Sequence, residues 1–307
     1  MSQPEYRVLV VGLGSMGAGV AKSCVAASLD TYGLDLDQQR CEELMVAGAT
    51  YAGAAINDDV AAQLDAVVML LVNAHQCRAV LFGEGGLAER LAAGSAVMLS
   101  STMAAEDAIS IAAELELKGL HVLDAPVSGG AAKAASGDLS VMAAGQPQVF
   151  EQLAPVLTAI AAHVHRVGTS TGQGATVKII HQLLAGVHIA AAAEAMALAS
   201  RADISLEALY QVVTSSAGNS WMFENRMRHV LDGDYTPHSA VDIFVKDLGL
   251  VNKTGLSLRF PLPLATTAYT MFANASNAGF GREDDAAVIK TFAGISLPEK
   301  GGESSCT

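Results

Sequence analysis

The sequence predicts an α/β protein with an N-terminal doubly wound parallel sheet, a long connecting helix and a C-terminal all-α domain. Over the first 168 residues, short apolar runs of strand length alternate with segments of helical periodicity. This is the pattern of a parallel sheet covered by helices on both faces. After that point we find helical periodicity and no convincing strand. With 307 residues, the chain is also long enough to form two packed units.

The sheet domain is expected to span residues 1–168. Its expected strands are residues 7–11, 31–35, 66–72, 96–99 and 120–123, because these short runs are largely apolar and are bounded by turn residues. Helices are expected at residues 38–47 and 76–81. Thr102 has the position of an N-cap for a further helix, with Glu106 and Asp107 in its first turns.

The connecting helix is expected within residues 169–202, after a loop at residues 168–174. The all-α domain, residues 203–297, shows helical periodicity at residues 206–215, 222–231, 240–258, 264–277 and 286–293. Pro261 and Pro263 separate two of these segments. The tail, residues 298–307, is polar and glycine-rich, which is typical of a disordered segment. The default place for chemistry in such a protein is between its two domains.

Composition narrows the class of partner. The chain is 51% hydrophobic with only 5% aromatic residues, and its formal net charge is -13. This charge argues against nucleic acid or an anionic membrane as a partner, because the protein would be repelled by either. A small anionic substrate would need a locally positive pocket.

Cysteine use and hydropathy favour the cytoplasm. Cys24, Cys41, Cys77 and Cys306 show no close pairing and are expected to be reduced thiols. The N-terminus lacks the basic region of a signal peptide. The Ala-rich stretch at residues 177–199 predicts a buried helix rather than a membrane span, because polar side chains interrupt it. These are Lys178, His181, Gln182, His188 and Glu194.

A glycine-rich motif follows the first expected strand. It consists of Gly12, Leu13, Gly14, Ser15, Met16 and Gly17. A strand that ends in glycines and turns directly into a helix offers backbone N–H groups and a positive helix dipole to a pyrophosphate. Asp35, eighteen residues beyond Gly17, can accept hydrogen bonds from the ribose hydroxyls. Together these features predict a Rossmann-type NAD site. The alternative is an ordinary glycine-rich turn with a solvated Asp35.

Two further segments carry candidate chemistry. Ser128, Gly129 and Gly130 can gather backbone N–H groups and a hydroxyl into a nest suited to a carboxylate, which a Cβ on either glycine would obstruct. A plain turn is the alternative. Lys178 stands in an otherwise apolar helix, so burial is expected to lower its pKa toward neutrality, where it can exchange a proton with an alcohol. The alternative is a lysine whose stem packs while its ammonium reaches water.

Histidines occur at two informative places. His181 lies three residues after Lys178, so the two side chains share a helix face. An imidazole can donate or accept a hydrogen bond and can carry a charge near pH 7. A core histidine with satisfied hydrogen bonds is the alternative. His163 and His165 sit in a strand-like segment without a cysteine or carboxylate set, so they predict the solvent face of an edge strand rather than a metal site.

Five motifs now fall in order: residues 12–17, 100–102, 124–130, 178–182 and 244–248. This set closely resembles the β-hydroxyacid dehydrogenase family, which includes 3-hydroxyisobutyrate, tartronate semialdehyde and 6-phosphogluconate dehydrogenases. The resemblance runs from about Arg7 to Phe292, and it is greatest to the L-threonate dehydrogenases, largely through residues 178–186. The chain departs from the commoner family pattern at His181, where an asparagine is usual. An imidazole there argues against a simple substrate and suits a polyhydroxylated acid.

The resemblance implies a role for each motif. Lys178 would be the catalytic general acid/base. Substrate would be bound by Ser128, Gly129, Gly130, His181 and Lys246, with Asp124 bracing the loop and Asp247 structural. NAD would contact Gly12, Leu13, Gly14, Ser15, Met16, Gly17, Asp35, Leu71, Val72, Asn73, Thr102 and Lys246, and Ser101 would pass close to the nicotinamide. Trp221 is expected to be a core aromatic, with a place in the wall of the pocket as the alternative, and Met16 is expected to pack as well.

The resulting expectation is an NAD-dependent enzyme that oxidises L-threonate to 2-dehydro-L-erythronate without a metal. It would act on this small anionic hydroxy acid as a homodimer or homotetramer. D-erythronate, D-glycerate (as a tartronate semialdehyde reductase) and 3-hydroxyisobutyrate are alternative substrates. A non-catalytic NAD-binding scaffold or sensor is the alternative from another class, and the retained Lys178 counts against it.

Overall fold

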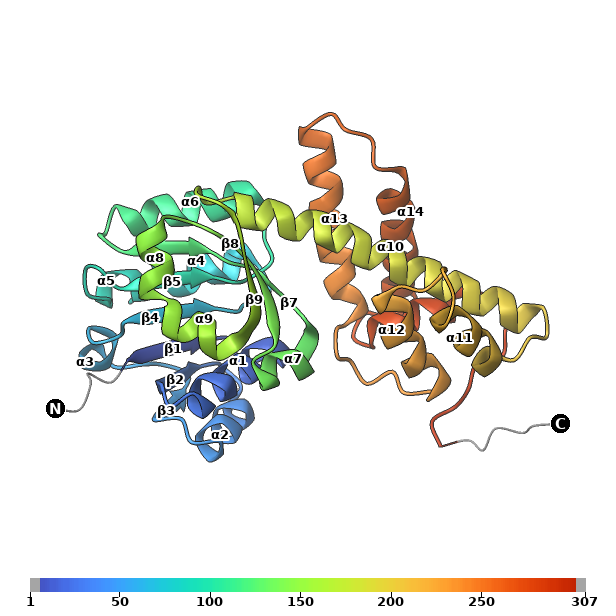
Figure 1. Cartoon of the computed structure of the whole chain (residues 1–307), viewed down its shortest axis with the longest axis horizontal. Helices are drawn as coiled ribbons and strands as arrows, with labels where there is room; N and C mark the ends of the chain where they lie inside the picture. The colour runs from blue at the N-terminus through green and yellow to red at the C-terminus, as the bar shows by residue number, and fades with distance from the viewer. Residues whose placement is uncertain (1–5, 302–307) are drawn as a thin grey trace. The chain divides into compact units, whose positions relative to one another are not determined.

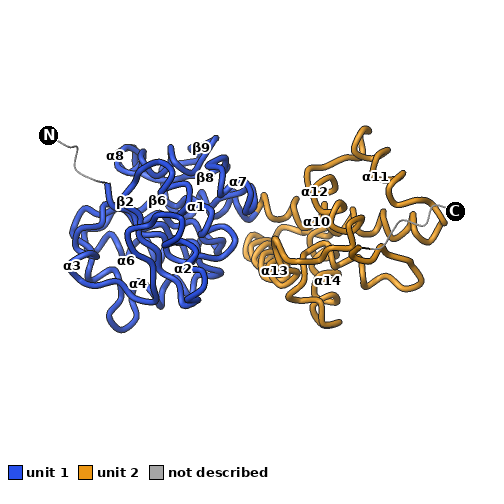
Figure 2. The backbone as a smooth tube through the Cα atoms, turned by 90° about the horizontal axis from the view of Figure 1, so that it is seen from below, with its two compact units in different colours: residues 1–179 blue, residues 180–307 orange. Residues whose placement is uncertain are grey.

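The computed structural model describes residues 6–301 and contains two compact units, residues 1–179 and 180–307 (Figure 2). The division falls within one long helix, α10 (Gln173–Arg201). Cys306 and the part of the expected disordered tail beyond residue 301 lie outside the described residues.

Unit 1 is built on a nine-stranded sheet within the described residues. Its order is β3-β2-β1-β4-β5-β6-β8-β7, and β9 pairs with β8. Strands β1 to β6 are parallel to one another, whereas β8 is antiparallel to β6 and β7. The strands are β1 (Arg7–Val11), β2 (Asp30–Leu34), β3 (Tyr51–Gly53), β4 (Ala66–Met69), β5 (Ala96–Leu99), β6 (His121–Asp124), β7 (Val127–Ser128), β8 (Leu139–Ala144) and β9 (Ala161–Gly168).

Helices cover both faces of this sheet, as the alternating pattern predicted (Figure 1). Val8 and Val10 of β1 enter one apolar core with α1, α2, α7, α8 and α9, while Leu9 and Val11 enter a second core with α3, α4, α5 and α6. Such two-sided burial explains why β1 is continuously apolar. The helices are α1 (Ser15–Ala26), α2 (Gln38–Val46), α3 (Asp58–Ala61), α4 (Ala74–Phe82), α5 (Leu87–Arg90), α6 (Ala105–Glu116), α7 (Gly130–Ser136), α8 (Pro147–Gln152) and α9 (Ala154–Ile160).

The prediction that Thr102 caps the next helix is wrong. Helix α6 begins at Ala105, and its N-cap, Ala104, makes no side-chain capping bond. The segment before α6 contacts the end of β4 instead. There, Ser101 Oγ accepts a hydrogen bond of 2.9 Å from the Leu71 backbone N–H. Glu106 and Asp107 do lie in the first turn of α6, where they complement the helix dipole.

Strand β9 confirms the expected edge position of the two histidines. It pairs with β8 alone among the described strands, and His163 and His165 are exposed. No group of three or more potential metal ligands occurs among residues 6–301.

Unit 2 is helical apart from a single bridge between Ala240 and Asp284 within its described part. Its core includes Phe244 and Phe272, whose ring centroids are 5.1 Å apart. Pro263 begins α14 rather than only ending the previous segment, because a proline lacks an N–H that the first turn would leave unpaired. The elements after α10 are α11 (Leu206–Thr214), α12 (Trp221–Leu231), α13 (Val241–Ser257), α14 (Pro263–Ala275), the π-helical turn η1 (Ser276–Phe280) and the 3-10 helix η2 (Asp285–Thr291).

Helix α10 is long and apolar enough by composition to cross a membrane, and it is the one such helix among the described residues. Half of its most apolar 18-residue window is buried inside the protein. Core helices of globular proteins have the same property.

Candidate active site

The glycine-rich loop is shaped by close packing at its two ends. Gly12 has φ +88°, and a Cβ there would lie 2.7 Å from the Leu70 carbonyl oxygen. A Cβ on Gly17 would lie 1.7 Å from the carbonyl oxygen of Gly12. Neither position therefore accepts a side chain without moving the backbone.

The middle of the loop is open. Around a Cβ on Gly14, the nearest atom is a guanidinium nitrogen of Arg40 at 3.9 Å. Gly14 is also the N-cap of α1, makes no side-chain capping bond, and has no acidic residue in the turn that follows. The first N–H groups of α1 therefore lack a capping side chain, which is the arrangement that a helix N-terminus needs to accept a phosphate.

Asp35 follows β2 and is fastened to this loop. Its Oδ2 accepts a hydrogen bond of 2.6 Å from the Leu13 backbone N–H, and its Oδ1 accepts one of 2.9 Å from the Asp37 backbone N–H. Arg40 Nη1 lies 3.7 Å from Asp35 Oδ2, a contact that the sequence did not predict. The glycine-rich loop and the uncapped N-terminus of α1 fit the pyrophosphate of NAD, and Asp35 fits its ribose.

The exits of strands β4 and β5 are brought together as neighbours in the sheet. The Ser101 hydroxyl links them through the Leu71 N–H and also donates to the Met69 carbonyl at 3.2 Å. Asn73 caps α4, accepting from the Gln76 N–H at 2.9 Å. The expected cofactor residues 71–73 and 102 thus lie on adjoining loops.

Ser128, Gly129 and Gly130 form the turn from β7 into α7. Gly129 and Gly130 both have positive φ, +142° and +76°. A Cβ on Gly129 would contact Lys133 and Leu139 at 3.0–3.1 Å, whereas a Cβ on Gly130 would meet no protein atom within 4 Å. At Gly130 it is the backbone conformation, not crowding within the protein, that favours glycine.

Asp124 ties the end of β6 to the start of α10. Its buried Oδ2 accepts hydrogen bonds from the backbone N–H groups of Gly172 and Ala175 at 2.7 and 3.0 Å. Burial raises the pKa of this carboxyl, although the same N–H groups act in the opposite direction. A Cβ on Gly174 would lie 2.5 Å from the Asp124 carbonyl oxygen. Asp124 therefore braces the first turn of α10, just before Lys178.

Lys178 is buried, with a relative exposure of 7%. This agrees with the apolar residues around it in the sequence. It precedes His181 by three residues within α10, so helical geometry places both on one side of the helix.

In unit 2, four polar residues form a continuous chain of contacts. His181 Nδ1 lies 3.0 Å from Gln182 Oε1, and Gln182 Nε2 donates to Asp247 Oδ2 at 2.6 Å. Asp247 Oδ1 lies 2.8 Å from Lys246 Nζ. The chain connects the two predicted substrate residues His181 and Lys246. The sequence did not predict these contacts of Gln182, although its place next to His181 was a signal.

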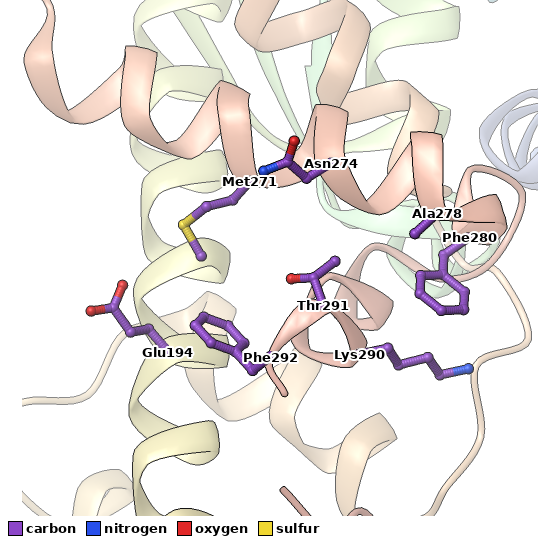
Figure 3. A pocket seen from close by; sticks show the side chains of 8 residues that line it. All are labelled: Glu194, Met271, Asn274, Ala278, Phe280, Lys290, Thr291 and Phe292. Atoms are coloured by element: carbon purple, nitrogen blue, oxygen red, sulfur yellow. The ribbon is translucent and has the colours of Figure 1, made fainter. Parts of the chain in front are cut away.

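Trp221 is half exposed at the first turn of α12, so the expectation of a core aromatic is wrong. Met16, in contrast, packs against the first core of unit 1. A cavity of about 750 Å³ in unit 2 lies elsewhere and includes none of the predicted site residues (Figure 3). It is lined by Glu194, Met271, Asn274, Ala278, Phe280, Lys290, Thr291 and Phe292.

Known proteins resemble the chain along almost its whole length. Residues 7–168 match the NAD binding domain of 6-phosphogluconate dehydrogenase, and residues 172–292 match the NAD-binding domain of NADP-dependent 3-hydroxyisobutyrate dehydrogenase. L-threonate dehydrogenase of Haemophilus influenzae is 64% identical over 98% of this chain and 100% of its own length.

The chain belongs to the β-hydroxyacid dehydrogenase family. The L-threonate dehydrogenase of Cupriavidus necator is 50% identical over 95% of this chain and 97% of its own length. A crystal structure of a 3-hydroxyisobutyrate dehydrogenase from Salmonella typhimurium is 60% identical, with a TM-score of 0.90 over 94% of this chain and 100% of that one. As a β-hydroxyacid dehydrogenase, the protein is an NAD-dependent oxidoreductase, and the predicted fold class is confirmed.

Proposed function

We propose that this β-hydroxyacid dehydrogenase oxidises L-threonate to 2-dehydro-L-erythronate with NAD. The observation that carries the proposal is the 50–64% identity to five L-threonate dehydrogenases over at least 95% of the chain. The imidazole of His181, next to the buried Lys178 in α10, supports a substrate with more than one hydroxyl.

The proposed roles divide between substrate and cofactor. Ser128, Gly129 and Gly130 hold the substrate carboxylate, and His181 and Lys246 bind hydroxyls. Lys178 accepts the proton of the reacting hydroxyl. When bound, NAD supplies the hydride acceptor. Residues 12–17, Asp35, Leu71, Val72, Asn73, Thr102 and Lys246 hold that cofactor.

A second candidate substrate is 3-hydroxyisobutyrate, because the related crystal structure carries that name. The two candidates differ in their hydroxyls: L-threonate has two beyond the reacting carbon, whereas 3-hydroxyisobutyrate has none. A site that hydrogen-bonds a substrate hydroxyl discriminates strongly against an analogue that lacks it.

The absorbance of NADH, followed over time, measures which of these acids the protein oxidises most efficiently. Purified protein is mixed with NAD and, in separate reactions, L-threonate, D-erythronate, D-glycerate and 3-hydroxyisobutyrate. We expect the highest kcat/KM for L-threonate. A higher value for any of the other three acids would overturn the proposal.

We also infer a cytoplasmic homodimer or homotetramer. Ile180, Leu184 and Leu198 are each more than half exposed and lie on one side of α10, an apolar face suited to a second copy. Cys24 and Cys41 are buried free thiols, which suits a reducing compartment. Sedimentation equilibrium of the wild type and of Leu198→Lys tests the assembly. A wild type that sediments as a monomer would contradict it.

A further inference from the structure

The contacts that join His181, Gln182 and Asp247 have one consistent hydrogen-bonding direction. Lys246 can only donate, and its ion-pair partner Asp247 is a carboxylate that can only accept. Asp247 Oδ2 lies 2.6 Å from the amide of Gln182, so that amide must present its NH₂ group there. The opposite orientation would set two oxygen acceptors against each other at this distance.

The orientation of the Gln182 amide then determines whether Nδ1 of His181 carries a proton. With its NH₂ on Asp247, the amide turns Oε1 toward His181 Nδ1, 3.0 Å away. Since Oε1 only accepts, Nδ1 must carry a proton. Gln182 and Asp247 are buried, at 8% and 2% relative exposure, so water has little access to replace these bonds. The assignment thus follows from the donor and acceptor chemistry of the neighbours.

We propose that Gln182 is a positioning residue that selects, for the neutral imidazole of His181, the tautomer protonated on Nδ1, so that Nε2 of the neutral ring accepts a hydrogen bond from a substrate hydroxyl. Asp247 anchors this arrangement from α13, 65 residues along the chain, and also holds Lys246. The substrate role of His181 rests on the proposed function. An acceptor at Nε2 suits a hydroxyl, which can donate, and disfavours a keto oxygen, which cannot.

Nuclear magnetic resonance of the full chain, with ¹⁵N-labelled histidine, measures the tautomer without any substrate. Long-range ¹H–¹⁵N correlations distinguish a proton on Nδ1 from one on Nε2, and His181→Asn identifies the signal among the eight histidines. In the wild type above pH 8 we expect the proton on Nδ1. A wild-type proton on Nε2 would overturn the proposal.

Gln182→Leu removes both amide contacts while approximately keeping the side-chain volume. We expect the His181 signal to change toward the Nε2-protonated tautomer and the kcat/KM for L-threonate to fall about tenfold, in line with one lost hydrogen bond. Gln211→Leu, at an exposed position on α11, is the matched control and should change neither. An unchanged His181 signal in folded Gln182→Leu would also overturn the proposal.

The two measurements separate this inference from the proposed function. If the tautomer is as expected but L-threonate is not oxidised, the substrate assignment fails and the positioning role of Gln182 stands. If L-threonate is oxidised while wild-type His181 carries its proton on Nε2, the positioning role alone fails.

Discussion

The backbone N–H of Leu13 donates a 2.6 Å hydrogen bond to Oδ2 of Asp35, so the glycine-rich loop and the ribose-side acid are joined directly. The same carboxylate that orients the loop is the group proposed to receive the ribose hydroxyls. Loop shape and cofactor choice should therefore depend on one residue.

The first prediction is a strong preference for NAD over NADP. Asp35, which holds the Arg40 guanidinium in an ion pair at 3.7 Å, would repel a 2′-phosphate, and Leu36 beside it offers no charge to bind one. We expect NAD to be preferred by orders of magnitude in kcat/KM, and Asp35→Ala to narrow the gap mainly by weakening NAD. Initial rates at matched cofactor concentrations measure this, with the exposed Glu42→Ala on α2 as control. Equal turnover of the two cofactors by the wild type would contradict it.

The second prediction concerns proton transfer. Lys178→Ala should lower kcat by about 10²–10⁴-fold, the usual effect of losing a general acid–base group. NAD affinity, measured by fluorescence titration, should change little because Lys178 is assigned to the substrate. Lys253→Ala, at an exposed position on α13, provides the control. A near-normal kcat in Lys178→Ala, or a loss confined to NAD affinity, would show that the assignment is wrong.

The third prediction tests whether His181 forms a hydrogen bond with a hydroxyl of the substrate. His181→Asn should reduce kcat/KM for L-threonate by about 1–3 kcal/mol in transition-state binding, the cost of an unmet buried hydrogen bond. The loss should be smaller for glycerate or 3-hydroxyisobutyrate. His163→Asn, on the exposed edge strand, should have no effect. Equal losses for every substrate would indicate shared chemistry instead, and no loss for any would leave His181 a packing residue.

A fourth prediction addresses the support of the catalytic helix. Asp124→Ala leaves the buried N–H groups of Gly172 and Ala175 without their acceptor, and each such group costs about 1–3 kcal/mol. We expect the free energy of unfolding in urea to fall by roughly 2–6 kcal/mol. Asp124→Asn, which keeps an oxygen acceptor, should lose less. Similar losses in both variants would mean that the carboxylate charge, not the hydrogen bonds, matters.

The fifth prediction is a pH dependence of stability from Asp285. Burial raises the pKa of this carboxyl to about 6, although the guanidinium of Arg226, with Nε 2.6 Å from Oδ1, favours the charged form. In the unfolded chain an aspartate titrates near pH 3.9. Between about pH 4 and 6 the folded state therefore binds the extra proton, and this group reduces stability as the pH rises.

Asp285→Asn should remove that dependence. Relative to the wild type, its free energy of unfolding should increase by up to about 3 kcal/mol between pH 4 and pH 7.5, from two pKa units at 1.36 kcal/mol each. Urea titrations across this range measure the difference, with the exposed Asp203→Asn as control. Parallel curves for the wild type and Asp285→Asn would contradict the prediction.

Local sequence patterns were sufficient to predict the structure where a residue acts through its immediate neighbours in the chain. Gly12 and Gly17 predicted the strand–turn–helix correctly. At both positions the neighbouring backbone comes so close that a Cβ atom would clash with it. Helices α2, α11 and α13 appeared within a residue or two of their expected positions, since helical periodicity is a local signal. Strand β8 was missed, because its stability depends on pairing with β7 and β9, which precede and follow it in the chain.

The sequence by itself determined the fold class, the cofactor motif and the position of Lys178 on an apolar helix. Only the tertiary structure decided that Ser101 links the strand exits, that Thr102 does not cap α6, and that Trp221 is half exposed. It also decided that Gln182 joins His181 to Asp247. The physical reason is the directionality of hydrogen bonds: a polar side chain's partner is set by distance and angle in the folded chain, and spacing along the sequence does not encode either.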